Sequence, residues 1–189
     1  MVARGRARVR VVEAGLLTGC RRALGSTPAV PAARALSLFG EHAGGWLLLG
    51  AAGWASGRHR DQWARGAAGV LLAHGAAVGV KRLVRRHRPR VPGAPPLVGT
   101  PSELSFPSAH AASTAAAAVG YAAMIGRPAA VTALGAMAVS RVLLGVHWPS
   151  DVVAGSLLGG GVAGGLRRWS AARAPGRDRE HRGRVVRAD

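Results

Sequence analysis

The stretch FPSAHAASTAAAAVGYAAMIGRPAAVTALGAMAVSRVLLGVHWPSD, residues 106–151, decides how this chain folds. It covers all but the first two residues of the Ala-rich apolar run Leu104–Gly126 and all of a second run, Pro128–Val146, which is interrupted only by Arg141; Arg127 lies between the two runs. The Pro-Ser pair near the beginning of the first run is typical of a helix start, and no alternation of β-branched residues indicates a strand. Because two consecutive helices run across a layer and back, we expect the polar ends FPSAH and HWPSD on the same face.

The remaining apolar runs favour a membrane protein made of helices. They are uncharged and rich in Ala, Gly and Leu: Ala43–Gly57, Gly66–Val80 and Val152–Leu166. Glycines four residues apart let helices approach closely in lipid, as in Gly155–Gly159, Gly160–Gly164 and Gly161–Gly165. Tryptophans lie near the ends of the runs, as in interface belts. The sequence therefore predicts an all-α, polytopic membrane helical bundle with about five spans. Several runs are shorter than the roughly 20 residues of a spanning helix, so a soluble Ala-rich bundle is the alternative.

The charged residues divide the chain into three parts. Residues 1–27 are expected to form a basic N-terminal tail, because their short apolar run carries Glu13 and does not fit a cleaved signal. Residues 28–168 are expected to form the membrane-embedded bundle. Its first segment, Pro28–Gly40, contains Arg34 and is predicted to be an N-terminal interfacial helix. Residues 169–189 are expected to form a basic C-terminal tail.

The strong positive charge limits the kinds of partner. Lys and Arg total 26 against 8 Asp and Glu, for a formal net charge of +18. Such an excess favours nucleic acid, anionic lipid headgroups or a phosphorylated substrate. The densest cluster, KRLVRRHRP at Lys81–Pro89, directly follows an apolar run. A basic cluster alone is also typical of a headgroup-binding surface, so its meaning depends on the other polar motifs.

Two further motifs carry groups suited to phosphate chemistry. His110 stands in the first turn of the helix that begins near Ser108, and a helix N-terminus offers free N–H groups to an anion. Arg141 lies near the end of the next helix, His147 in the turn after it, and Asp151 at the start of the following helix. The four-residue spacing of His147 and Asp151 is close enough for the carboxylate to orient the imidazole. The across-and-back topology places both motifs on the face that carries KRLVRRHRP.

Together the three motifs resemble the signature of the membrane-bound type 2 phosphatidic acid phosphatase family. That signature reads K-x6-R-P, P-S-G-H and S-R-x5-H-x3-D. This chain matches it at Lys81…Arg88-Pro89, Pro107-Ser108-Ala109-His110 and Ser140-Arg141…His147…Asp151. The one departure is Ala109, where the family has Gly; Ala is acceptable in a first helical turn and keeps its N–H. The resemblance covers residues 81–151 and implies the helical bundle of the family.

The resemblance implies a phosphatase that works through a phosphohistidine. Its catalytic residues would be His147 as the nucleophile, Asp151 as the partner that orients its imidazole, and His110 as the general acid that later activates water. Phosphate would be bound by the other motif residues: Lys81, Arg88, Ser108, Ala109 and Arg141. The reaction would be hydrolysis of a phosphomonoester or a pyrophosphate.

The acidic residues argue against a metal mechanism, and no cofactor is expected. A two-metal phosphatase needs several carboxylates in one place, whereas only Glu103 and Asp151 lie near the motifs. Cationic side chains are therefore expected to neutralise the phosphate without a metal ion.

An active site beside apolar helices favours a phosphate on a lipid, whose tail can stay in the bilayer. The chain is similar to small family members that act on polyprenyl phosphates, including decaprenylphosphoryl-5-phosphoribose in arabinan precursor synthesis. Undecaprenyl pyrophosphate, phosphatidylglycerophosphate and phosphatidate are the other candidate substrates. We expect a multi-pass protein of the cell membrane that does not bind nucleic acid. Two other classes stay open: a vanadium-dependent haloperoxidase, which shares the motifs, and a non-enzymatic basic membrane protein.

Overall fold

The computed structural model describes residues 2–173, and every named element in this range is helical. The elements are α1 (Val2–Leu24), α2 (Ala29–Gly40), the 3-10 helix η1 (Glu41–Ala43), α3 (Gly44–Ala55), α4 (Arg60–Val84), α5 (Ala109–Ile125), α6 (Arg127–Leu143) and α7 (Pro149–Arg173). Two isolated bridges are the only extended pairings within residues 2–173. The prediction of an all-α fold is therefore confirmed.

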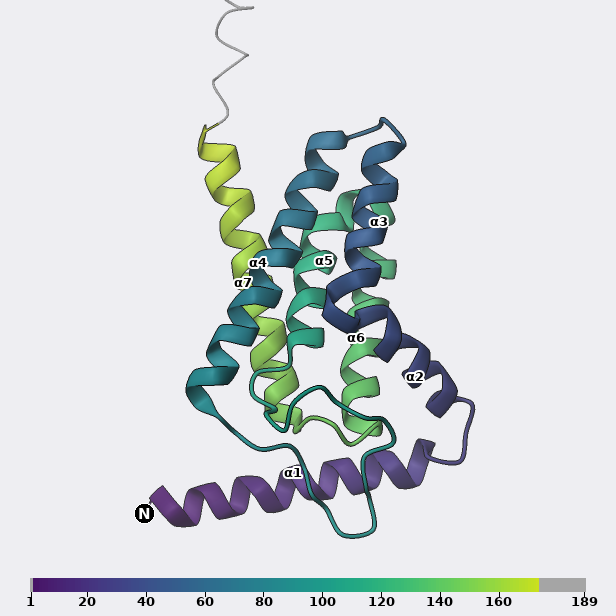
Figure 1. Ribbon diagram of the computed structural model, residues 1–189, viewed down its shortest axis with the longest axis vertical. Coiled ribbons are helices and arrows are strands. Elements are labelled where there is room, and N and C mark those ends of the chain that lie inside the picture. The colour runs from purple at the N-terminus through teal and green to yellow at the C-terminus, as the bar shows by residue number, and fades with distance from the viewer. Residues whose placement is uncertain (1, 174–189) are drawn as a thin grey trace, which may run out of the picture.

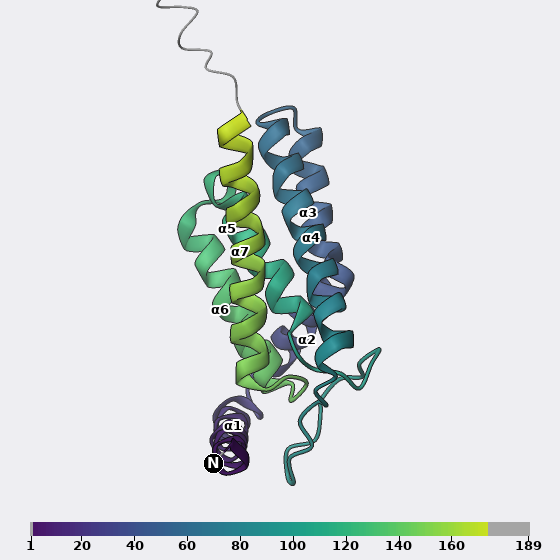
Figure 2. The ribbon, with the colours of Figure 1, turned by 90° about the vertical axis from the view of Figure 1, so that its left-hand side faces the viewer.

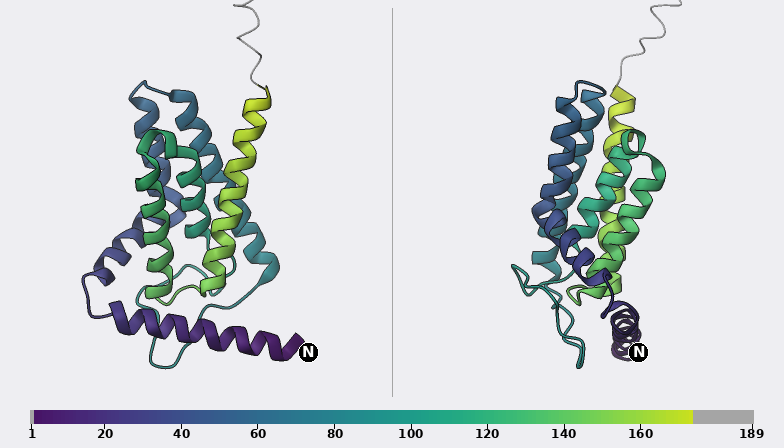
Figure 3. Two further views of the ribbon diagram at one scale, coloured as in Figure 1. Left: turned by 180° about the vertical axis from the view of Figure 1, so that it is seen from behind. Right: turned by 90° about the vertical axis from the view of Figure 1, so that its right-hand side faces the viewer.

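Helices α3 to α7 stand side by side in an upright bundle, with α5 near its centre (Figures 1 and 2). Helix α5 packs against α4, α6 and α7. Seen from behind, α6 lies beside α5, and α2 leads obliquely from the end of α1 toward α3 (Figure 3). The turn between α5 and α6 sends the chain back along the bundle, as the across-and-back topology predicts.

Helix α1 lies crosswise beneath one end of the bundle (Figure 1). It packs against α6 and α7, and its Leu17 is completely buried. The α4–α5 connection and the α6–α7 turn lie at this same end (Figure 1). The segment that sequence analysis describes only as a basic tail thus contains a long helix. This helix lies beneath the α4–α5 connection and the α6–α7 turn.

Small residues let α7 approach α5 closely. A side chain at Gly155 would collide with the carbonyl oxygen of Ser108, and one at Gly159 would collide with that of Ala112. The predicted close approach is therefore confirmed for Gly155–Gly159. Around Gly160, Gly161, Gly164 and Gly165, by contrast, a Cβ would meet open space in the described chain.

Polar side chains inside the bundle pair with each other. The Trp46 Nε1–H donates to Thr114 Oγ1 at 2.9 Å, and the Tyr121 hydroxyl donates to the Trp46 carbonyl oxygen at 3.1 Å. The Trp63 ring packs against Tyr121, with centroids 5.0 Å apart. Trp46 and Trp63 are therefore core residues, whereas Trp54 and Trp169 are exposed, and their position at a membrane interface stays a prediction.

The described residues contain one helix, α4, that is long and apolar enough to cross a membrane, and α5 is a shorter apolar helix. The count of about five spans stays a prediction, as does the interfacial position of Pro28–Gly40, which contains α2. Most of the predicted C-terminal tail, 169–189, lies outside the described residues; residues 169–173 extend α7.

The contrast between adjacent glycines of α7 makes the helix packing testable. Gly159→Ala should lower the free energy of unfolding by about 1–3 kcal/mol, because the added methyl group overfills the α5–α7 contact. Gly160→Ala should have no such cost, because its Cβ meets open space and Ala favours a helix over Gly. The measurement is thermal unfolding in detergent, and equal Tm losses in the two variants would contradict the packing described here.

Candidate active site

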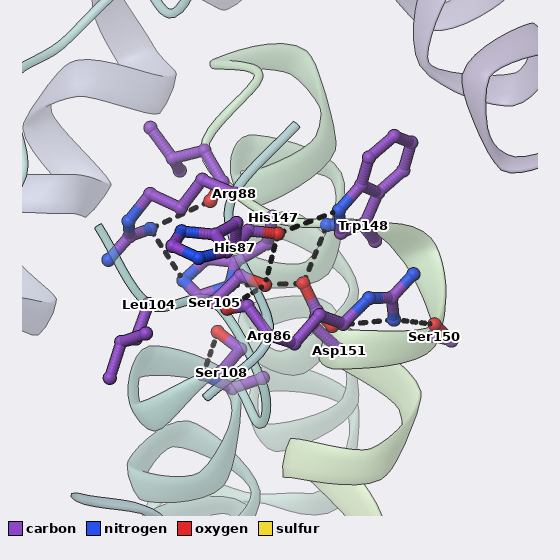
Figure 4. A network of polar contacts seen from close by, with 12 residues as sticks. Arg86, His87, Arg88, Leu104, Ser105, Ser108, His147, Trp148, Ser150 and Asp151 are labelled. Atoms are coloured by element: carbon purple, nitrogen blue, oxygen red, sulfur yellow. Dashed lines mark hydrogen bonds and ion pairs between the residues drawn. The ribbon is translucent and has the colours of Figure 1, made fainter. Parts of the chain in front are cut away.

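The three sequence motifs meet at the end of the bundle that α1 covers. Lys81 comes from the last turn of α4, His110 from the first turn of α5, Arg141 from the last turn of α6, and Asp151 from the first turn of α7. His147 lies in the α6–α7 turn, and its ring faces Arg88 of the α4–α5 connection (Figure 4).

The α4–α5 connection is held in place by its own backbone. The Arg88 N–H donates to the Glu103 carbonyl oxygen at 3.1 Å, and the Ser105 N–H donates to the Arg86 carbonyl oxygen at 2.7 Å. Trp148 Nε1–H donates to the His87 carbonyl oxygen at 3.1 Å. These bonds join the two ends of the connection to each other and to the α6–α7 turn (Figure 4), so they fix where the arginines of the first motif lie.

Ser108 joins the second motif to the third. Its side chain caps α5 by accepting from the Ala111 N–H at 3.3 Å, as the predicted helix start requires. Its own N–H donates to the Asp151 carbonyl oxygen at 2.9 Å. That N–H is thus already used, and a contact of Ser108 with phosphate would come from its hydroxyl. The N–H of Ala109 belongs to the first turn of α5, where N–H groups have no intrahelical acceptor.

His147 is buried and neutral. Burial lowers the pKa of its imidazole to about 4, against the opposing effect of Asp151. Its Nε2 lies 3.3 Å from Arg88 Nη1, and a guanidinium can only donate. The Nε2 lone pair therefore faces Arg88, and the proton lies on Nδ1, 3.7 Å from Asp151 Oδ2. This separation is longer than a hydrogen bond, so the carboxylate faces the imidazole but does not hydrogen-bond to it.

Arg88 is anchored over His147 by two carbonyl oxygens. Its Nη1 donates to the Val146 carbonyl oxygen at 2.7 Å, and its Nε donates to the Ser102 carbonyl oxygen at 2.7 Å. Burial lowers the pKa of the Arg88 guanidinium, while Asp151 and Glu103 oppose this effect. An arginine keeps its charge under such conditions, so Arg88 is a fixed cation beside the imidazole.

Arg141 is a buried cation with an unused donor. Its residue exposure is 2%, and its Nε donates to Ser140 Oγ at 3.1 Å. Its Nη2 has no hydrogen-bond partner among residues 2–173. A buried charged donor without an acceptor is costly, and an oxyanion would supply that acceptor.

His110 lies against α2. Its Nε2 is 3.1 Å from the Ser37 carbonyl oxygen, which can only accept, so Nε2 carries a proton. Glu41 Oε2 lies 3.9 Å from the same nitrogen. A side chain at Gly40 would collide with the imidazole, so the close approach of α2 depends on this glycine.

Sequence analysis misses two residues of the site, Glu13 and Arg86. It places Glu13 in a basic tail and leaves Arg86, one arginine of the cluster Lys81–Pro89, without a role in the site. In the structure Arg86 Nη1 donates to Asp151 Oδ1 at 2.8 Å, and Arg86 Nη2 donates to Glu13 Oε2 at 2.6 Å. The one available signal is that Glu13 is the only acidic residue before Glu41 in a strongly basic segment.

The described residues contain no group of three or more His, Cys, Asp or Glu that could hold a metal ion. The arrangement instead offers cations, two histidines and helix N-termini. Such a set can bind a tetrahedral oxyanion and place a neutral imidazole against its central atom.

Comparisons with known proteins agree with this chemistry. The model of the PAP2 superfamily matches residues 63–175. A decaprenylphosphoryl-5-phosphoribose phosphatase of Mycolicibacterium smegmatis is 52% identical over 145 residues, which cover 76% of this chain and 81% of that protein. The protein of the same name from Mycobacterium tuberculosis is 46% identical over 152 residues, covering 79% and 86%.

A solved structure has a similar fold. It is described as the first transmembrane PAP2 type phosphatidylglycerolphosphate phosphatase, from Bacillus subtilis. The match has a TM-score of 0.70 over 90% of each chain, at 21% sequence identity. This likeness concerns the fold alone.

The unpaired donor of Arg141 predicts an oxyanion site. Orthovanadate should raise the Tm of the wild-type protein, because a ligand at 100 times its Kd stabilises the folded state by about 2.7 kcal/mol. Arg141→Gln should lose most of this shift, whereas Arg90→Gln, which changes an exposed arginine of the α4–α5 connection, should keep it. Equal shifts in both variants would contradict the assignment.

Proposed function

Because this chain belongs to the PAP2 superfamily, whose members hydrolyse phosphate esters, we propose that it is a membrane phosphatase acting on decaprenylphosphoryl-5-phosphoribose in cell-wall arabinan precursor synthesis. Two mycobacterial relatives of that name, at 46–52% identity and over more than four fifths of their length, support this substrate. The observation that carries the proposal is the buried, unsatisfied guanidinium of Arg141 beside a neutral His147.

Phosphate binding is assigned to the cations and to the start of α5. Arg141 Nη2 and Arg88 Nη2 would donate to the non-bridging oxygens, and Lys81 would add its ammonium. The Ala109 N–H and the Ser108 hydroxyl would complete the cradle at the positive end of the α5 dipole. In this arrangement, the charge that spreads over the phosphoryl oxygens in the transition state meets fixed donors.

The chemistry proceeds in two displacements at phosphorus. In the first, His147 Nε2 forms a bond to phosphorus as the bond to the leaving oxygen breaks, and His110 in its protonated form gives that oxygen a proton. The imidazole of the phosphohistidine is then cationic, and its Nδ1–H faces the Asp151 carboxylate. In the second, water attacks phosphorus while His110 takes its proton, which releases inorganic phosphate and free His147.

The bundle suits a lipid substrate. With α3 to α7 set in the cell membrane as a multi-pass protein, the site would lie near one surface, between the loops and α1. The polyprenyl tail would remain in the bilayer while the phosphorylated headgroup reaches His147. Helix α2 would then lie at the interface, where Arg34 can reach water.

The test is phosphate release by the purified protein from a panel of lipid phosphates, with His147→Ala as the control. We expect decaprenylphosphoryl-5-phosphoribose to be hydrolysed with a higher kcat/KM than undecaprenyl pyrophosphate, phosphatidylglycerophosphate or phosphatidate. A higher kcat/KM for any of these three would overturn the substrate assignment while keeping the reaction.

Phosphate release should persist in excess EDTA. The reason is that Arg86 bridges Glu13 and Asp151, and the described residues contain no group of three or more His, Cys, Asp or Glu that could hold a metal ion, whereas a metal pair needs several carboxylates. Loss of activity in EDTA with recovery in magnesium would contradict the mechanism.

Substitutions of the two histidines should affect activity differently on substrates with different leaving groups. His147→Ala should abolish turnover on every substrate, because no covalent intermediate can form. His110→Ala should cost roughly 10²–10⁴-fold on the lipid phosphate, whose leaving oxygen needs a proton, and much less on an activated aryl phosphate. The measurement is the ratio of aryl to alkyl phosphate activity in each variant. If the activated substrate restores His147→Ala rather than His110→Ala, the two roles are reversed.

A further inference from the structure

We infer that Glu13 of helix α1 is a positioning residue of the active site, which acts through Arg86 on the Asp151–His147 pair. The inference rests on the proposed function for its kinetic readout. It makes the N-terminal helix, which lies outside all three motifs, part of the catalytic apparatus.

Glu13 is buried and uses both carboxylate oxygens. Its residue exposure is 4%. Oε2 accepts from Arg86 Nη2 at 2.6 Å, and Oε1 accepts from the Ser150 N–H at 3.0 Å and from the Ser150 hydroxyl. A buried carboxylate is costly unless it is fully paired, and here every contact leads to a residue next to Asp151 or bonded to it.

Arg86 bridges two carboxylates. Its Nη2 is bonded to Glu13, while its Nη1 donates to Asp151 Oδ1 at 2.8 Å and to Ser150 Oγ at 2.6 Å. The guanidinium also lies 5.4 Å from the centre of the Trp148 ring. Figure 4 shows Arg86 between Ser150 and Asp151, on the side of Asp151 away from His147.

The charge balance explains why the second carboxylate matters. Asp151 and Glu13 together carry two negative charges against one on Arg86, so the group keeps a net negative charge. On the other sides, His147 is faced by cations of the loop and of α4, Arg88 and Lys81. Without Glu13, Arg86 would neutralise Asp151 alone, and the group facing the cationic phosphohistidine would lose its net negative charge.

Glu13 also fixes the start of α7. The first helical residue, Pro149, has no N–H, and Trp148 before it offers no side-chain oxygen as a cap. The Ser150 N–H, which has no intrahelical acceptor, is instead satisfied by Glu13. Asp151 Oδ2 accepts from the Trp148 N–H at 2.9 Å, as in a capping box. The carboxylate that faces His147 is thus held between its own helix and α1.

The experiment compares Glu13→Gln with wild type across pH on an aryl phosphate and on the lipid phosphate. We expect kcat to fall by roughly 10–100-fold with little change in KM, as for other residues that orient a catalytic imidazole. The acid limb of kcat/KM should move to lower pH. The sign follows because Glu13 contributes negative charge that favours imidazolium, so its loss lowers the pKa of His147. The substrate phosphate titrates identically for every variant.

Three further variants separate positioning from stability. Leu17→Ala loosens the buried face of the same helix without changing charge, so it should lower Tm but leave the acid limb in place. Asp61→Asn removes an exposed carboxylate from the first turn of α4, at the other end of that helix from Lys81, and should change neither. In the pair Glu13→Gln with Arg86→Gln, the double variant should be no slower than Arg86→Gln alone, because Glu13 acts through Arg86.

The outcomes are distinct. The inference would be overturned if the acid limb of Glu13→Gln stays in place and its activity falls only in proportion to the decrease in Tm, as in Leu17→Ala. Glu13 would then be a structural anchor. If the fold losses in kcat of the two single variants multiply in the double variant, Glu13 does not act through Arg86. If the wild-type protein hydrolyses neither substrate, the proposed function fails instead. Partial recovery in Glu13→Asp, which keeps the charge on a shorter side chain, would support positioning.

Discussion

Burial of the Arg141 guanidinium at the end of an apolar helical bundle is the constraint on which the site depends. The cation is almost completely buried, and within residues 2–173 its one side-chain partner is the neutral hydroxyl of Ser140. Neither imidazole beside it is a negative counter-ion, so its charge is available to an anion that enters the site. Among the described residues no carboxylate bonds to this guanidinium, which favours an anionic substrate over a permanent ion pair, and Glu13 and Asp151 lie on the far side of the His147 imidazole.

The alignment of the catalytic groups follows from the contact between α5 and α7. Gly155 and Gly159 allow the two backbones to come so close that the Ser108 N–H reaches the Asp151 carbonyl oxygen. That bond ties the first turn of α5, with His110, to the first turn of α7, with Asp151. A helix pair held at backbone distance has little freedom to slide, so the general acid and the partner of the nucleophile keep a fixed separation. The small residues of the α5–α7 contact therefore determine the geometry of the polar residues of the site.

Much of this arrangement can be predicted from the sequence, for identifiable reasons. Apolar runs and a Pro-Ser start predict α5 and α6, and the spacing of His147 and Asp151 predicts their meeting, because all of these are local patterns. Glu13 and Arg86 could not be predicted, because one carboxylate in a basic segment and one arginine among several carry no spacing signal. Their pairing depends on the crosswise position of α1, which is a tertiary contact across more than 70 residues. Trp46 is similar: its place at the end of an apolar run indicates an interface, whereas its bond to Thr114 makes it a core residue.

The described chain begins at one end of the bundle, with α1, and finishes at the other, with α7 (Figure 1). For a bundle that stands upright in a bilayer, the start of α1 and the end of α7 at Arg173 face different compartments, and the candidate active site shares its compartment with the start of α1. A label attached at Arg173 therefore lies on the side remote from the candidate site, where it leaves the substrate path open. One attached before α1 lies on the same side as Glu13, and its folding and bulk act directly on the helix that supports the active site.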